Sequence, residues 1–86
     1  MEPHDIRLKR LLMRSNYRGI KEMDIIMGGF AKTHLAQLML DEIDIYEQLL
    51  SENDHDIYAW ILGTADTPDP FKPLIGKLKK HAEADF

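Results

Sequence analysis

The sequence predicts an all-α fold, a small single-domain bundle of about five short helices. Apolar residues recur at three- and four-residue spacing along the chain, and no run alternates for long enough to indicate a strand. The chain has 86 residues, so residues 1–86 are expected to form one domain. Because folding at this size buries only about 60–65% of the unfolded surface, a deep substrate cavity is not expected.

The first helix is expected over residues 3–15, and Asn16 and Gly19 end it. Pro3 suits the first turn of a helix, where its missing N–H would have no partner. The stripe that faces the core consists of three leucines: Leu8, Leu11 and Leu12.

The second helix is expected to begin near Gly19. The adjacent Gly28 and Gly29 predict a kink or an early end, because glycine weakens a helix interior. The residues expected to face the core are Ile20, Met23, Ile26, Met27 and Phe30. Four methionines at apolar helical positions are expected to fill the core: Met13, Met23, Met27 and Met39. Residues 33–40 are apolar, but their structure is ambiguous.

The remaining helices are shorter. Asp41 followed by Asp44 resembles an N-cap with an acidic third position and predicts a third helix to about Ser51. Asn53 or Asp54 is expected to cap a fourth helix that Gly63 ends. Asp69 as cap and Pro70 in the first turn predict a last helix over about 70–82. The buried residues expected here are Ile43, Tyr46, Leu49, Leu50, Ile57, Trp60, Ile61, Phe71, Leu74, Ile75 and Leu78.

Charge is unevenly distributed along the chain. The net charge is −4, yet Lys and Arg crowd the N-terminal quarter and are absent between Lys32 and Lys72. A net acidic chain argues against non-specific nucleic-acid binding, which usually needs a basic domain. The absence of cysteine excludes disulfides, thiolate zinc sites and cysteine nucleophiles.

Catalytic and metal sites find little support in the sequence. The four histidines are scattered, and the Asp54-His55-Asp56 run suits a helix N-terminus better than a metal ion. An acid/base enzyme that uses the middle carboxylates is a weak alternative, since nothing marks two of them as an opposed pair. We therefore expect no catalytic residue and no metal ligand, and a binding module rather than an enzyme.

The beginning of the chain carries acids and no apolar run, so it resembles neither a secretory signal nor a transit peptide. No segment approaches the roughly 18 apolar residues of a membrane span. These features lead us to expect a cytoplasmic, bacterial protein.

The segment from Arg18 to Asp24 is the strongest candidate for a functional site. A glycine at the edge of a helix costs about 1 kcal/mol against alanine, so Gly19 indicates an unusual backbone angle or a close approach of another backbone. Arg18 and Glu22 are four residues apart and are expected to share a helical face. An exposed ion pair on the surface of a helix is the alternative interpretation.

Two motifs resemble the family of succinate dehydrogenase FAD-assembly factors. Arg18-Gly19 with Glu22-Met23-Asp24 is similar to the family signature R-G-x-x-E-[LM]-D. The stretch from Leu49 to Ile61 is similar to L-L-x-x-x-D-x-D-[LI]-[YF]-x-W-[LI]. The resemblance covers about residues 9–63 and is not evident after Gly63.

The resemblance implies a five-helix assembly factor, similar to a chaperone. Such a factor binds the flavoprotein subunit of succinate dehydrogenase or fumarate reductase and promotes covalent attachment of FAD to it. The implied partner-binding residues are Arg18, Gly19, Glu22, Asp24, Arg14 and Arg10. Some members carry a basic residue where Tyr17 stands here, which leaves less positive charge at the site.

The resemblance also implies that FAD belongs to the client protein and is not held stably by this chain. The free chain is expected to be a monomer, and the last helix to complete the bundle. The alternative function is a regulatory protein–protein module, such as an antitoxin-type partner of a small membrane-associated toxin, since one surface could serve either partner.

Overall fold

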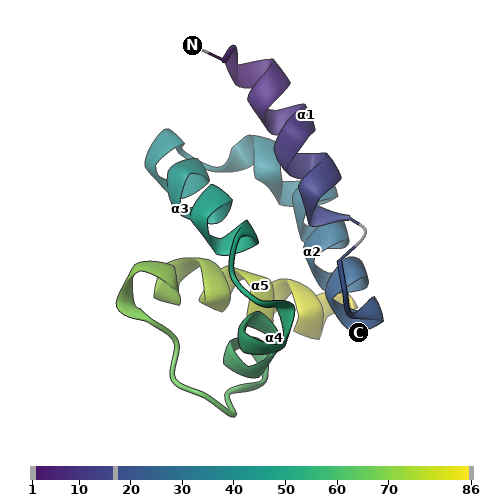
Figure 1. Ribbon diagram of the computed structural model, residues 1–86, viewed down its shortest axis with the longest axis vertical. Coiled ribbons are helices and arrows are strands. Elements are labelled where there is room, and N and C mark those ends of the chain that lie inside the picture. Colours follow the sequence, from purple (N-terminus) through teal and green to yellow (C-terminus); the bar gives the residue numbers. More distant parts are fainter. Residues whose placement is uncertain (1, 17, 86) are drawn as a thin grey trace.

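A computed structural model describes residues 2–16 and 18–85 of the chain, and in this part it contains helices and no strand. Figure 1 shows the helices packed into one bundle. Their order is α1 (His4–Ser15), α2 (Lys21–His34), η1 (Leu35–Gln37), α3 (Leu40–Leu50), α4 (Asp54–Leu62), η2 (Asp69–Phe71) and α5 (Lys72–Asp85), with η denoting 3₁₀ turns. The predicted all-α fold with about five helices is confirmed.

All five α-helices contribute buried residues to one hydrophobic core. Helix α1 contacts α2 and α3, and α5 contacts α2, α3 and α4 (Figure 1). The apolar residues expected to face inward from the last three helices are all buried, and so are most of those in α2. Of the leucine stripe in α1, Leu11 is fully buried, while Leu8 and Leu12 pack against the edge of the core.

The early end predicted at Gly28 and Gly29 is wrong, because α2 runs unbroken from Lys21 to His34. A Cβ atom on Gly28 would lie 2.6 Å from Asn16 Oδ1, and one on Gly29 would lie 3.0 Å from His81 Nε2. The two glycines therefore leave room for the Asn16 and His81 side chains against α2. Packing against these neighbours offsets the low helix propensity of glycine.

The start of α3 also differs from the prediction. Met39, rather than Asp41, is the N-cap residue, and the Glu42 carboxylate accepts a hydrogen bond from the Met39 backbone N–H at 3.0 Å. The other Glu42 oxygen pairs with Lys77 of α5 at 2.7 Å. The Lys77 ammonium and the Met39 N–H lower the pKa of Glu42. Asp44 instead pairs with Arg7 of α1.

Two of the four methionines do not fill the core. Met23 and Met27 are fully buried, but Met13 and Met39 are about 70% exposed. Met13 lies on the outer face of α1, and Met39 precedes the first turn of α3. The helical spacing of apolar residues therefore did not show which of the methionines are buried and which are exposed.

The later helix boundaries follow the local sequence signals closely. The Asn53 side chain accepts a hydrogen bond from the His55 N–H and caps α4, which ends at Gly63 with φ of 80°. Asp69 and Pro70 begin a 3₁₀ turn, and α5 itself starts two residues later than predicted. No helix in the described part of the chain has the length and hydropathy to cross a membrane.

Candidate functional site

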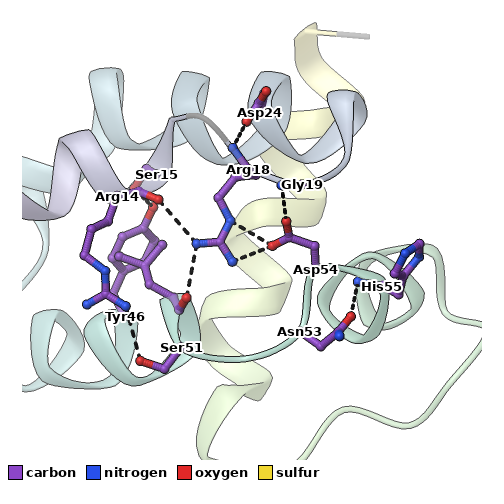
Figure 2. Close-up of polar contacts among 11 residues, drawn as sticks. Arg14, Ser15, Arg18, Gly19, Asp24, Tyr46, Ser51, Asn53, Asp54 and His55 are labelled. Carbon is purple, nitrogen blue, oxygen red and sulfur yellow. Dashed lines mark hydrogen bonds and ion pairs between the residues drawn. The ribbon is translucent and has the colours of Figure 1, made fainter.

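An ion pair between Arg18 and Asp54 organises the region of the predicted partner-binding motif. Arg18 Nε donates to Asp54 Oδ1 at 2.8 Å, and Nη2 donates to the same oxygen (Figure 2). The two side chains are only 10% and 12% exposed. Arg18 precedes α2, and Asp54 is the first residue of α4, so the pair joins two distant parts of the chain.

The second oxygen of Asp54 holds the backbone of the motif. Asp54 Oδ2 accepts a hydrogen bond from the Gly19 N–H at 2.6 Å. A Cβ on residue 19 would lie 3.3 Å from this oxygen, which is tighter than most Cβ contacts. Gly19 thus has an intramolecular reason to lack a side chain, whereas the approach of a partner's backbone to it stays a prediction.

Further hydrogen bonds fix the turn between α1 and α2. The Asp24 carboxylate accepts a hydrogen bond from the Arg18 backbone N–H, as Figure 2 shows. Arg18 Nη1 donates to the carbonyl oxygens of Leu50 at 3.1 Å and Arg14 at 3.3 Å. A single guanidinium therefore bonds to the last turn of α1, the end of α3 and the start of α4. Arg is suited to this role because its planar fork carries five donors.

A buried pair of hydroxyl groups lies beside this ion pair. Ser15 Oγ donates to the Leu11 carbonyl at 2.8 Å and lies 2.6 Å from the Tyr46 hydroxyl. Because the Ser15 proton is committed to Leu11, the Tyr46 hydroxyl donates to Ser15. Burial raises the pKa of Tyr46 to about 12, against the opposing effects of the Ser15 hydrogen bond and the Arg18 charge.

The other predicted basic residues lie along α1. Arg14 Nη2 donates to Ser51 Oγ at 3.2 Å, next to the Arg18 cluster. Arg10 lies one turn further away, where it pairs with Glu2 at 2.8 Å and Glu47 at 3.0 Å. Both guanidinium groups are thus engaged within the chain while remaining partly accessible to a partner.

Glu22 is placed differently from the rest of the motif. Arg18 lies before the helix and turns toward Asp54, so the expected common helical face of Arg18 and Glu22 does not form. The Glu22 side chain is exposed, and no described residue forms a hydrogen bond or ion pair with it. The motif therefore divides into an inward part that fixes the turn and an outward carboxylate.

Sequence reasoning assigned Asp54 to a helix cap and did not connect it with Arg18. The sequence left the cap open between Asn53 and Asp54, and the structure shows that Asn53 supplies it, so Asp54 is not needed as the cap. Tyr17, where some family members carry a basic residue, lies outside the described residues. Among residues 2–16 and 18–85, His, Asp and Glu form no group of three that could hold a metal ion.

Comparisons with known proteins found a matching family and several relatives of this chain. A family model described as flavinator of succinate dehydrogenase matches residues 9–82, which include both motifs and most of α5. Curated proteins named succinate dehydrogenase assembly factor 2, mitochondrial, are similar to this chain. The protein from Lodderomyces elongisporus is 40% identical over 95% of this chain and 53% of its own length. The one from Dictyostelium discoideum is 37% identical over 85% of this chain and 52% of its own.

These matches correct one expectation and define the family. The chain spans little more than half the length of the curated relatives it matches. The relatives are mitochondrial proteins of eukaryotes, which contradicts the expected bacterial, cytoplasmic location. Their description as assembly factors supports the expectation that the chain is not an enzyme. Because the family model covers most of the chain, this protein belongs to the family described as flavinators of succinate dehydrogenase.

Proposed function

We propose that this chain is an assembly factor that binds the flavoprotein subunit of succinate dehydrogenase, or of fumarate reductase, and promotes covalent attachment of FAD to it. The family match over residues 9–82 carries this proposal. The matched region includes Arg18, Gly19 and Glu22, which the resemblance to the family signature implies as partner-binding residues.

The geometry of the motif supports a binding role. The Arg18–Asp54 pair and the Gly19 hydrogen bond fix the turn before α2, so a partner would meet a preorganised surface. Preorganisation reduces the entropy lost on binding. Arg14 and Arg10 extend this surface along α1 with partly exposed guanidinium groups.

We further propose that FAD is held by the client and not by this chain, which is a monomer when free. The motif is a poor binding site for the pyrophosphate of FAD, because the Arg18 guanidinium is already bound to Asp54. The carboxylates of Glu22 and Asp24 lie on either side of Met23 and would repel a phosphate. A purified chain without flavin absorbance would agree with this proposal.

Co-purification with the flavoprotein subunit tests the function. Wild-type chain should bind the subunit and raise its covalent FAD, read as flavin fluorescence after denaturing electrophoresis. Glu22→Ala should weaken both effects with only a small change in melting temperature, because Glu22 is exposed and unpaired in the described structure. Asp66→Ala, which removes an exposed carboxylate in the loop after α4, serves as the control.

Two results would contradict the proposal. One is a normal level of covalent FAD in cells that lack this protein. The other is a different principal partner in a pull-down, such as the small membrane-associated toxin of the alternative interpretation.

A further inference from the structure

An apolar groove of about 290 Å³ lies between α2 and α4, on the side of the motif to which Glu22 belongs. We call it the α2–α4 groove. Its apolar lining comes mainly from Ile25, Ile26, Tyr58, Ile61 and Leu62, and Glu22 contributes the charged group.

The spacing of these residues makes the groove a continuous surface. Glu22, Ile25 and Ile26 are separated by three and four positions, so they share one face of α2. Tyr58, Ile61 and Leu62 repeat the same spacing on α4. These two helical faces line the groove together with Ala82 of α5, the helix that contacts both α2 and α4.

Two aliphatic side chains that line the groove are exposed to solvent. Ile25 is 44% exposed and Leu62 is 57% exposed, although both helices also bury several residues in the core. Single exposed aliphatic side chains are common, and here two of them line one groove together with the Glu22 carboxylate.

The groove is coupled to the motif through Asp54. Asp54 and Tyr58 are four residues apart on α4, and Asp54 binds the turn that leads into α2. The Arg18–Asp54 pair therefore fixes the first turn of α4 relative to the start of α2. The groove begins at Glu22 in the first turn of α2 and at Tyr58, one turn into α4.

We infer that the α2–α4 groove receives a segment of the flavoprotein subunit in which an aliphatic side chain lies next to an arginine or lysine. This inference rests on the proposed function and names the chemistry of the contact. The aliphatic side chain would fill the groove between Ile25 and Leu62, and the cation would pair with Glu22. A volume of about 290 Å³ suits one or two side chains, and the Glu22 carboxylate opposes an anionic ligand such as FAD.

Charge insertion into the groove gives the first test. Leu62→Glu and Ile25→Glu should each weaken binding to the purified flavoprotein subunit at least about tenfold, because a carboxylate would have to be desolvated in the apolar contact. Met39→Glu is the matched control, since Met39 is 70% exposed, lies outside the groove and adds the same charge. It should bind within about twofold of wild type. Glu22→Gln should reduce the salt dependence of binding.

The lack of cysteine in the chain permits a second, direct test. Leu62→Cys introduces a unique thiol that can carry a photo-reactive cross-linker, and Met39→Cys provides the control. We expect Leu62→Cys to cross-link to a subunit peptide that contains an aliphatic residue beside a basic one, and Met39→Cys to give little product.

The outcomes separate the two proposals. If wild type does not bind the flavoprotein subunit, the proposed function fails and the inferred occupant fails with it. If wild type binds but Leu62→Glu and Ile25→Glu bind equally well, the groove inference alone is overturned. Cross-links from Leu62→Cys only to a second copy of this chain, or to a peptide without a basic residue, would also overturn it.

Discussion

Arg18 and Asp54, 36 positions apart in the chain, are joined through the guanidinium group while the same carboxylate also accepts the Gly19 N–H. This arrangement uses both oxygens of Asp54 and connects the turn before α2 to the first residue of α4. The pair joins the two sequence motifs, and this contact gives a physical reason why they occur together. The first motif supplies the arginine, and the second supplies the carboxylate that holds it.

Loss of the Asp54 charge should destabilise the fold. Asp54→Asn leaves the Arg18 guanidinium, which is 10% exposed, without its ion-pair partner, and we expect a loss of about 2–4 kcal/mol in the free energy of unfolding. Asp56→Asn removes an exposed carboxylate from the same helical turn and should cost less than about 1 kcal/mol. Urea unfolding followed by circular dichroism measures both, and equal losses would contradict this role of Asp54.

Two glycines in helices should respond differently to alanine. Gly76→Ala should stabilise the protein by about 0.5–1 kcal/mol, because a Cβ there meets no atom within 4 Å and alanine favours a helix. Gly28→Ala should give no such gain, since its Cβ would lie 2.6 Å from Asn16 Oδ1. In an Asn16→Ala background the gain at position 28 should return. Thermal unfolding of the four variants tests this, and an equal gain from Gly28→Ala alone would refute the steric argument.

The buried contact between Ser15 and Tyr46 should show energetic coupling. Ser15→Ala leaves the Tyr46 hydroxyl without its acceptor in a fully buried position, which should cost about 1–3 kcal/mol. With Tyr46→Phe also present, the same Ser15→Ala change should cost less, because no buried donor is then left unpaired. A double-mutant cycle measures the coupling, and strictly additive effects would rule it out.

Stability should fall at high pH because of Tyr46. In the unfolded chain this phenol ionises near its ordinary value of about 10, whereas its pKa in the folded protein is about 12. Between these values the unfolded state has released a proton that the folded state keeps, so the free energy of unfolding decreases as pH rises. The loss should approach about 2–3 kcal/mol near pH 12. Urea titrations over this range should show a weaker decrease for Tyr46→Phe, and an unchanged slope would exclude Tyr46 as its cause.

Local sequence signals sufficed for much of the fold. The apolar periods located all five helices, and Asn53 and Gly63 marked the two ends of α4 because capping depends on a few adjacent residues. The same reasoning failed at Gly28 and Gly29, where the reason for glycine lies in Asn16, which follows α1, and in His81 of α5. It also failed at Met39, whose N–H is bound by a glutamate three residues later that Lys77 of α5 holds in place.

In the candidate site, too, the sequence determined some features and the tertiary structure decided others. The sequence by itself determined the helices, the family signature and the set of residues from Arg10 to Asp24 that we predict to bind a partner. Only the tertiary structure decided that Arg18 faces inward to Asp54, that Gly19 is held by the same carboxylate, and that Glu22 faces an apolar groove. Helix periodicity is encoded by neighbours within a few positions, whereas the orientation of a side chain before a helix depends on which distant group it meets.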